Sequence, residues 1–324
     1  MLPTDSLQSL TISPLMPWAD LEDSISSVVL RCGPSLMEFV PPIPLSDAAI
    51  NHLLHLPHLH TWHIEGPPPS YSPLSLPPVF PPLTEFTLGG DATRGWFSLF
   101  ERLERSASAT QGMAPLSKVK ESLESLDIEN LPGSIIDASF TSTIQIFWNL
   151  VHLGVEGPCH DGHNNGQCTF KLNNDNVTDL AVALPRLEYL LLGHPCFEKV
   201  CATTVACLLP MSVHCTKLQE VEIHFNTTNI VEDFKNILAD PQFQELHSLP
   251  KCTLSCLNVA QTPLTLDEPG FEIVANGIVD IFPGLGELGT GSIRESRDFE
   301  RYEHYRHVSV ASDFPSPGTL LNHK

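Results

Sequence analysis

The fold of this 324-residue chain is decided by one stretch, Leu180-Ala-Val-Ala-Leu184-Pro185-Arg-Leu187-Glu-Tyr-Leu190-Leu-Leu192. Its first half completes a run in which apolar residues recur at i, i+3, i+4 and i+7 from Val177, which is the spacing of one helix face. The polar residues 173–175 ahead of that run are of the kind that caps a helix. Pro185 then stops the helix, and the leucines after it alternate as in a short strand with one buried face. The stretch therefore predicts a helix, a turn and a strand in close succession.

The strand half of this stretch recurs along the chain as L-x-x-L-x-L, with bulky substitutes for leucine. Successive copies start 29, 23, 24, 40, 27, 37, 31, 36 and 31 residues apart, so the units are irregular in length. A strand with its helix cannot bury an apolar face alone, but stacked units bury it against each other. The copies are Leu7/Leu10/Ile12, Leu36/Phe39, Leu59/Trp62/Ile64, Leu83/Phe86/Leu88, Leu123/Leu126/Ile128, Leu150/Leu153/Val155, Leu187/Leu190/Leu192, Leu218/Val221/Ile223, Leu254/Leu257/Val259 and Leu285/Leu288.

Segments with helical spacing lie between these strands, at Trp96/Leu99/Phe100/Leu103, Phe234/Ile237/Leu238 and Phe271/Val274/Ile278. Prolines end several of them, because Pro57, Pro185 and Pro283 each stand two residues before the first leucine of a unit. Alternating helices and strands of this length predict an α/β solenoid of about ten irregular repeats. Its parallel sheet is expected on the concave side and its helices on the convex side.

These units resemble those of eukaryotic leucine-rich-repeat proteins of the ribonuclease-inhibitor-like type, and most closely the repeat regions of fungal F-box proteins. The resemblance is carried by residues 180–192 and by Trp148-Asn149-Leu150-Val-His-Leu153-Gly-Val155. It covers roughly residues 5–290. It implies a horseshoe-shaped repeat domain that binds another protein on its surface.

F-box proteins of this type use their repeats to recognise substrates of a cullin ubiquitin ligase, and the F-box itself docks onto a Skp-family adaptor. The resemblance therefore implies the substrate-recognition region of such a ligase subunit. The first repeat begins at Leu7, which leaves no room for an F-box, so Skp-family adaptor and cullin are expected as partners only if an F-box exists upstream. The alternative is a free-standing repeat protein that binds or inhibits a partner without any ligase link.

Charge excludes several classes of ligand. Against 17 Lys and Arg stand 38 Asp and Glu, giving a formal net charge of −21. A nucleic-acid binder needs a basic footprint, so neither nucleic acid nor an anionic membrane is expected as a partner, and a basic protein is the better electrostatic match. No secretory signal or membrane-spanning run is present, and nine cysteines are too few for a disulfide scaffold, which favours a cytoplasmic or nuclear protein.

Two insertions and a tail interrupt or follow the repeat domain, which is predicted to span residues 1–290. A Pro-rich insertion occupies residues 66–82 and is expected to be a stiff surface loop. A Gly- and Asn-rich loop follows at 157–168. Residues 291–324 are expected to form a capping helix, with Arg and aromatic residues interleaved, and a frayed tail.

Candidate chemistry is sparse. Two cysteines and two histidines in the 157–168 loop suit zinc by type, although their spacing is unusual, so a zinc-binding protein is a second alternative; the residues are Cys159, His160, His163 and Cys168. The G-x-G-x-x-G match at residues 284–289 lacks the downstream β-α units of a dinucleotide fold. Nothing arranges a catalytic triad, so the chain is predicted to need no cofactor and not to be an enzyme.

The concave face is the most informative surface. Strand side chains alternate, so the third, fifth and seventh residues of each unit should point to that side. Nine of these 30 positions are acidic and none is Lys or Arg, whereas the chain-wide frequency of acidic residues gives about 3.5. The hypothesis is an acidic trough for a basic partner, and the alternative is a solvated face that keeps the array soluble. His63 and His152 also fall here, and the predicted binding residues are Glu38, Glu65, Glu85, Asp127, Glu129, Glu156, Tyr189, Glu220, Glu222, His224 and Glu287.

Overall fold

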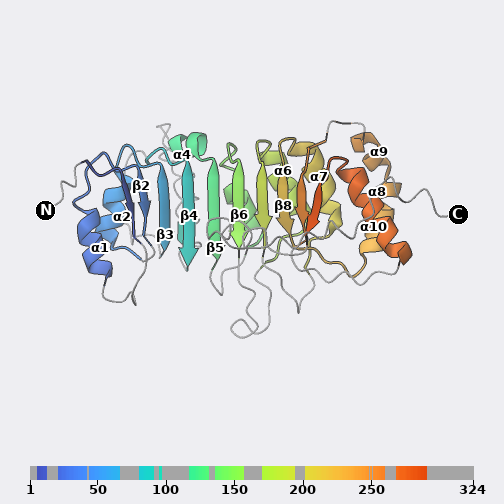
Figure 1. Cartoon of the computed structure of the whole chain (residues 1–324), viewed down its shortest axis with the longest axis horizontal. Helices are drawn as coiled ribbons and strands as arrows, with labels where there is room; N and C mark the ends of the chain where they lie inside the picture. Colours follow the sequence, from blue (N-terminus) through green and yellow to red (C-terminus); the bar gives the residue numbers. More distant parts are fainter. Residues whose placement is uncertain are drawn as a thin grey trace.

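The computed structural model of the chain describes most of the repeat region and none of the tail. The described residues are 6–12, 21–41, 44–65, 80–90, 95–96, 117–130, 136–156, 170–193, 201–247, 249, 251–259 and 268–289. They form one long array of strands and helices (Figure 1).

A single ten-stranded parallel sheet runs the length of the array, and its strand order is the order of the strands in the chain. Each inner strand hydrogen-bonds to the strands of the units before and after it, whereas β1 and β10 each have one neighbour. The predicted α/β class and parallel sheet are thereby confirmed. The strands are β1 Ser9–Thr11, β2 Glu38–Val40, β3 Thr61–Glu65, β4 Glu85–Gly90, β5 Ser125–Asn130, β6 His152–Glu156, β7 Tyr189–Leu192, β8 Glu220–Ile223, β9 Cys256–Asn258 and β10 Glu287–Gly289.

One apolar side chain per strand holds the register. The second strand position is filled in every unit by the middle residue of the repeat pattern, and these residues pair with one another from strand to strand. They belong to, or pack against, one continuous core that extends through all units. The row consists of Leu10, Phe39, Trp62, Phe86, Leu126, Leu153, Leu190, Val221, Leu257 and Leu288.

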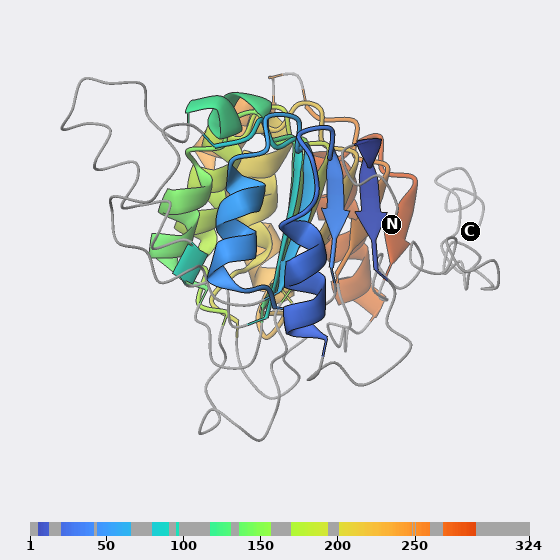
Figure 2. The same cartoon turned by 90° about the vertical axis from the view of Figure 1, so that its left-hand side faces the viewer.

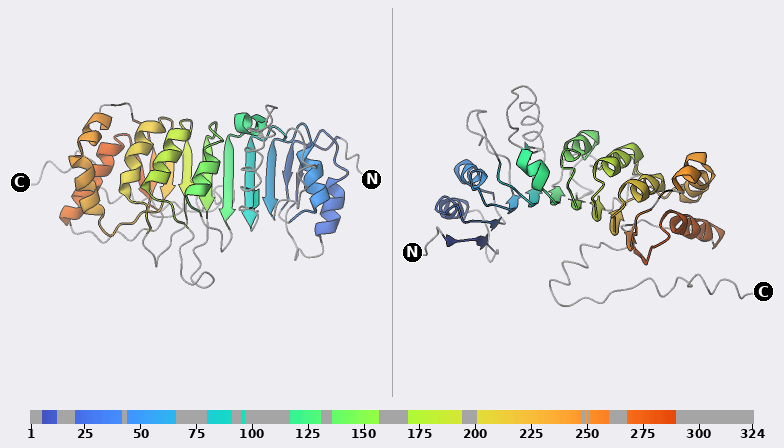
Figure 3. Two further views of the ribbon diagram at one scale, coloured as in Figure 1. Left: turned by 180° about the vertical axis from the view of Figure 1, so that it is seen from behind. Right: turned by 90° about the horizontal axis from the view of Figure 1, so that it is seen from above.

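Helices lie on the other side of this core. Seen from above, the array curves gently, with the strands along its inner side and the helices along its outer side (Figure 3). Seen from its N-terminal end, the first two helices stand in front of those of the later units (Figure 2). The arrangement is solenoid-like. The helices are α1 Glu22–Val29, α2 Asp47–Leu54, α4 Ser117–Ser122, α5 Ala138–Ile144, α6 Asn174–Ala183, α7 Leu208–His214, α8 Ile230–Ala239, α9 Pro241–His247 and α10 Glu268–Ile281.

Local sequence explains where α6 begins and ends. Asn173 caps it, because its side chain accepts a hydrogen bond from the Asn176 backbone N–H at 2.9 Å. The Asn176 side chain in turn accepts from the Asn173 N–H at 3.2 Å, which completes a capping box. The helix ends at Ala183, two residues before Pro185, as the sequence predicts.

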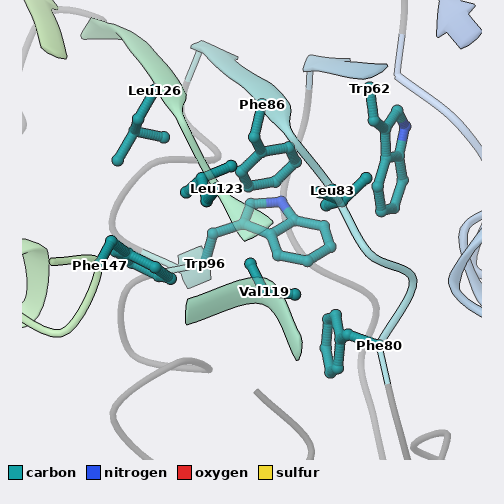
Figure 4. A pocket seen from close by; sticks show the side chains of 9 residues that line it. All are labelled: Trp62, Phe80, Leu83, Phe86, Trp96, Val119, Leu123, Leu126 and Phe147. Carbon is teal, nitrogen blue, oxygen red and sulfur yellow. The ribbon is translucent and has the colours of Figure 1, made fainter. Parts of the chain in front are cut away.

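An aromatic cluster fills the core beneath β3 and β4. Trp96 lies at its centre and meets the rings of Trp62 and Phe86 edge-on, with centroid distances of 5.8 Å and 6.0 Å (Figure 4). Phe80 joins this cluster and is only 2% exposed. The end of the Pro-rich insertion is therefore part of the core, because a buried phenylalanine contributes far more by packing than a solvated loop residue. Residues 66–79 lie outside the described part of the chain.

A polar side chain just before the first leucine of a unit often reaches back to the preceding unit. Ser122 donates to the carbonyl of Leu83 at 2.7 Å. Asn149 is 6% exposed and donates to the carbonyl of Glu121 at 2.8 Å. Arg186 then donates to the Asn149 side-chain oxygen at 2.7 Å, so this amide connects three successive units.

Replacing Asn149 should therefore weaken the array. Asn149→Ala removes both hydrogen bonds and leaves the Glu121 carbonyl and the Arg186 guanidinium without this partner, which costs about 1–3 kcal/mol in free energy of unfolding. Urea unfolding followed by circular dichroism measures this loss. Asn236→Ala on the exposed face of α8 is the matched control, and equal unfolding midpoints for the two variants would contradict the assigned role.

Buried cysteines line the same core. Among the described residues, Cys32, Cys201, Cys207, Cys215 and Cys252 are buried free thiols. Cys207 and Cys215 flank α7 and are 0% and 1% exposed, so they act as small core residues at the helix ends. Burial raises the pKa of Cys207, raises that of Cys215 to about 12 and raises that of Cys252 to about 11.

These raised pKa values make the fold sensitive to alkaline pH. The unfolded chain releases thiol protons near the ordinary pKa of 9.0, whereas the folded chain keeps them up to about 11 or 12. The stability contribution is thus complete below pH 9 and is lost as pH rises through this window, at up to ~1.4 kcal/mol per pH unit for each thiol. Urea midpoints measured at several pH values above 9 should fall less steeply for Cys215→Ala than for the wild type. Parallel slopes would show that Cys215 does not titrate in this way.

Candidate binding surface

The inner face is the side of the sheet that points away from the core and the helices. It is formed by the first, third and fifth positions of the strands, because side chains alternate along a strand. The first positions pair from strand to strand in one row: Ser9, Glu38, Thr61, Glu85, Ser125, His152, Tyr189, Glu220, Cys256 and Glu287. The third positions form a second row: Thr11, Val40, His63, Thr87, Asp127, Gly154, Leu191, Glu222, Asn258 and Gly289.

Acidic side chains occur along the whole inner face, and two are held by hydroxyl groups of a neighbouring strand. Glu38 accepts a hydrogen bond from the Ser9 hydroxyl at 2.8 Å. Glu85 accepts from the Thr61 hydroxyl at 3.3 Å and is exposed. Carboxylates fixed in this way are preorganised acceptors for a cationic ligand. Glu156, Glu220 and Glu287 also lie on this face, and Glu287 is exposed.

The centre of the inner face carries a polar chain across three strands. His152 Nε2 donates to Asp127 Oδ1 on β5 at 3.0 Å. On its other side the imidazole stacks on the Tyr189 ring of β7, with centroids 4.3 Å apart and planes inclined by 6°. Gly154 makes room for the carboxylate, because a Cβ at that position would lie 2.1 Å from Asp127 Oδ1. The lack of a side chain at Gly154 thus permits the Asp127–His152 pair.

An apolar patch adjoins this chain. Tyr189 and Leu191 of β7 form a small cluster separate from the main core, and Cys256 of β9 packs against it. Leu191 is 2% exposed although it points away from the helices. The sequence predicted Tyr189 as a residue of this surface but did not predict Leu191, Cys256 or Gly154. The only sequence feature that could have identified these three is their position in the repeat.

Two of the predicted binding residues are buried, unlike the side chains of a solvated acidic face. Glu222 of β8 is 3% exposed, and His224, just after the same strand, is 9% exposed. A buried carboxylate is stable only when hydrogen-bonded or paired, so Glu222 is a structural part of this face rather than a rim charge. Glu85 and Glu287 are exposed, and Glu38, Asp127, Glu156 and Glu220 are partly exposed, so an incoming ligand can reach these carboxylates.

Other predicted features lie outside the described residues. These are the side chains of Glu65 and Glu129, the 157–168 loop with Cys159, His160, His163 and Cys168, and the 291–324 tail. Within the described ranges, no group of three or more His, Cys, Asp or Glu residues is placed to hold a metal ion. Residues 287–289 of the G-x-G-x-x-G match form β10, so the motif does not open a helix as a dinucleotide site requires.

Comparisons with known proteins do not assign the chain to a family. No protein-family model matches the chain, and no curated protein is significantly similar to it. Among the helices that the structure describes, none has both the length and the apolar character needed to cross a bilayer.

The role of Gly154 can be tested by adding one methyl group. Gly154→Ala forces the Asp127 carboxylate away from His152 and should lower the free energy of unfolding by about 0.5–1.5 kcal/mol, the value of a typical hydrogen bond. Gly289→Ala, at the same strand position in β10, is the matched control because its Cβ would meet Asn258 at an ordinary 3.6 Å. Urea unfolding of both variants checks this, and the prediction fails if they are equally stable.

Proposed function

We propose that this chain is a leucine-rich-repeat protein of the ribonuclease-inhibitor-like type, with a horseshoe shape. Its inner face binds a basic segment of another protein, and the chain does not catalyse a reaction. The observation that carries the proposal is the inner face itself: acidic side chains occur on strands from β2 to β10 around the Asp127–His152–Tyr189 chain. In the ten strands that the structure describes, neither the first nor the third position is Lys or Arg.

The chemistry of this face supports binding of a cationic protein segment. Carboxylates spread along one face attract an approaching cation over longer distances than a single ion pair does. The buried side chains of Tyr189 and Leu191 form a small apolar cluster among these carboxylates, so they support the face structurally rather than offer contact surface. Histidine stacked on tyrosine holds both rings in place before any partner arrives, which reduces the entropy lost on binding.

Within this class we propose the substrate-recognition region of an F-box-type ubiquitin-ligase subunit of fungal origin, acting in the cytoplasm or nucleus. Support comes from the irregular repeats, whose prolines precede the strands, and from free cysteines in the described residues. The Skp-family adaptor and cullin enter this proposal only through an F-box upstream of the repeats. A free-standing repeat protein that binds or inhibits its partner without a ligase remains the competing proposal.

Reversing charge on the inner face tests the binding proposal. The double variant Glu85→Lys/Glu220→Lys should lower recovery of the partner about three- to tenfold, because each reversed surface charge changes affinity modestly. Affinity purification with quantitative mass spectrometry compares it with the wild type and with Glu272→Lys, an exposed acid on the outer helix α10. The binding proposal requires proteins that are lost only from the inner-face variant.

The same measurement separates the two classes of repeat protein. Co-purification of adaptor and cullin subunits with the protein made from its native transcript supports the ligase proposal, and their absence supports the free-standing binder. If the inner-face variant and Glu272→Lys recover every protein equally, the inner face is not the binding surface.

A further inference from the structure

The N-terminal end of the array has a sheet edge that no other described strand pairs with. Among the described strands, β1 pairs with β2 alone, and Figure 2 looks onto this end. Gln8 and Ile12 face β2, because the Gln8 carbonyl accepts from the Glu38 N–H at 3.1 Å and the Ile12 N–H donates to a β2 carbonyl at 3.2 Å. Successive residues of a strand direct these groups to opposite edges, so the N–H and C=O groups of Ser9 and Thr11 point outward. An edge of this kind can pair with a further strand.

The apolar core is less well covered at this end. In the second-position row the eight inner residues are at most 3% exposed, whereas Leu10 is only partly buried. On α1, Ser26 accepts a hydrogen bond at 3.0 Å from the Ser46 N–H of the next unit. Val28 lies about 200° further round this helix and is 39% exposed, so it points away from that unit and toward the N-terminal end. An apolar surface placed against this end would exclude water from it.

Charge indicates which surface can approach this edge. Residues 6–12 carry no charged side chain, and residues 21–31 carry two acids and one arginine. At the opposite end, residues 268–289 carry four acids and no Lys or Arg. A head-to-tail contact between two copies would place the acids of α10 beside Glu22 and Asp23 of α1. In a chain with a net charge of −21, two copies therefore repel each other less when their N-terminal ends meet.

The outward groups of β1 are complementary to themselves about a two-fold axis. When two β1 strands run antiparallel with both Leu10 residues on the axis, Ser9 of one copy lies opposite Thr11 of the other. Each such pair exchanges two backbone hydrogen bonds, one in either direction. The two Leu10 side chains meet on the core side, where directly opposed Cβ atoms lie about 4.5–5.5 Å apart. One register thus pairs the backbone groups of both edges and joins the two apolar ends.

We propose that two copies of this chain associate through β1 into a closed dimer with two-fold symmetry. The sheet continues across the contact, and the two core ends cover each other as adjacent units do within one chain. Both inner faces then lie on the same side of the dimer and form one continuous surface. The inference goes beyond the proposed binding function and does not depend on it, because the dimer contact uses none of the inner-face carboxylates.

Sedimentation equilibrium of the full chain tests the association. Since the contact is small, it should show monomer and dimer in equilibrium, with a dissociation constant of roughly 10–100 µM. Thr11→Pro removes an N–H that faces outward and leaves the pairing with β2 in place. It should raise the dissociation constant about tenfold, because each dimer loses two hydrogen bonds. Thr11→Val keeps the N–H and is the matched control, which should dimerise like the wild type. A monomer at every concentration, or equal dissociation constants for the proline and valine variants, overturns the proposal.

Cross-linking between chains tests the geometry without a proline. A mixture of Ser9→Cys and Thr11→Cys proteins is treated with a short bifunctional thiol reagent, and mass spectrometry should find positions 9 and 11 joined between the two chains. A mixture of Ser9→Cys and Glu287→Cys proteins should give no link between positions 9 and 287. A link there shows head-to-tail pairing and overturns the two-fold dimer, as does the lack of any link between positions 9 and 11. Loss of partner recovery in Glu85→Lys/Glu220→Lys is a separate result, so the binding proposal can hold or fail independently of the dimer.

Discussion

The row of apolar side chains at the second strand position is the constraint on which the rest of the molecule depends. From Leu10 in β1 to Leu288 in β10, each member pairs with its counterparts in the adjacent strands and lies in or against the common core. A slip of one residue in any unit would turn that strand over and expose its core side chain. Fixing this row therefore also fixes which residues face outward, and the acidic character of the inner face follows from the residues between the leucines.

Much of this could be predicted from the sequence because the repeat pattern is local. The pattern in residues 187–192 specifies its own strand, and Pro185 specifies where the helix before it ends. The Asp127–His152 pair could not be predicted, because it joins residues 25 positions apart whose meeting depends on the register between two units of different length. The burial of Phe80 was missed for a related reason: proline-rich composition indicates a loop but does not show which of its residues the core needs.

The inner face combines exposed carboxylates with a buried, largely apolar centre. Exposed carboxylates such as Glu85 act at a distance and weaken with added salt. The His152–Tyr189 stack and the buried Leu191 form the largely apolar centre of this face. Glu222 belongs to neither group, because its burial makes it a structural element that tolerates little change.

The sequential order of the strands has a mechanical consequence. Since each strand that the structure describes bonds only to its neighbours in sequence, no strand pairing joins the first described unit directly to the last. The repeat units at the two ends have a single neighbour each. They therefore unfold before the middle units when the temperature rises or the chain is pulled. The array can also bend along its length. Small changes in its curvature then alter the distance between carboxylates several strands apart.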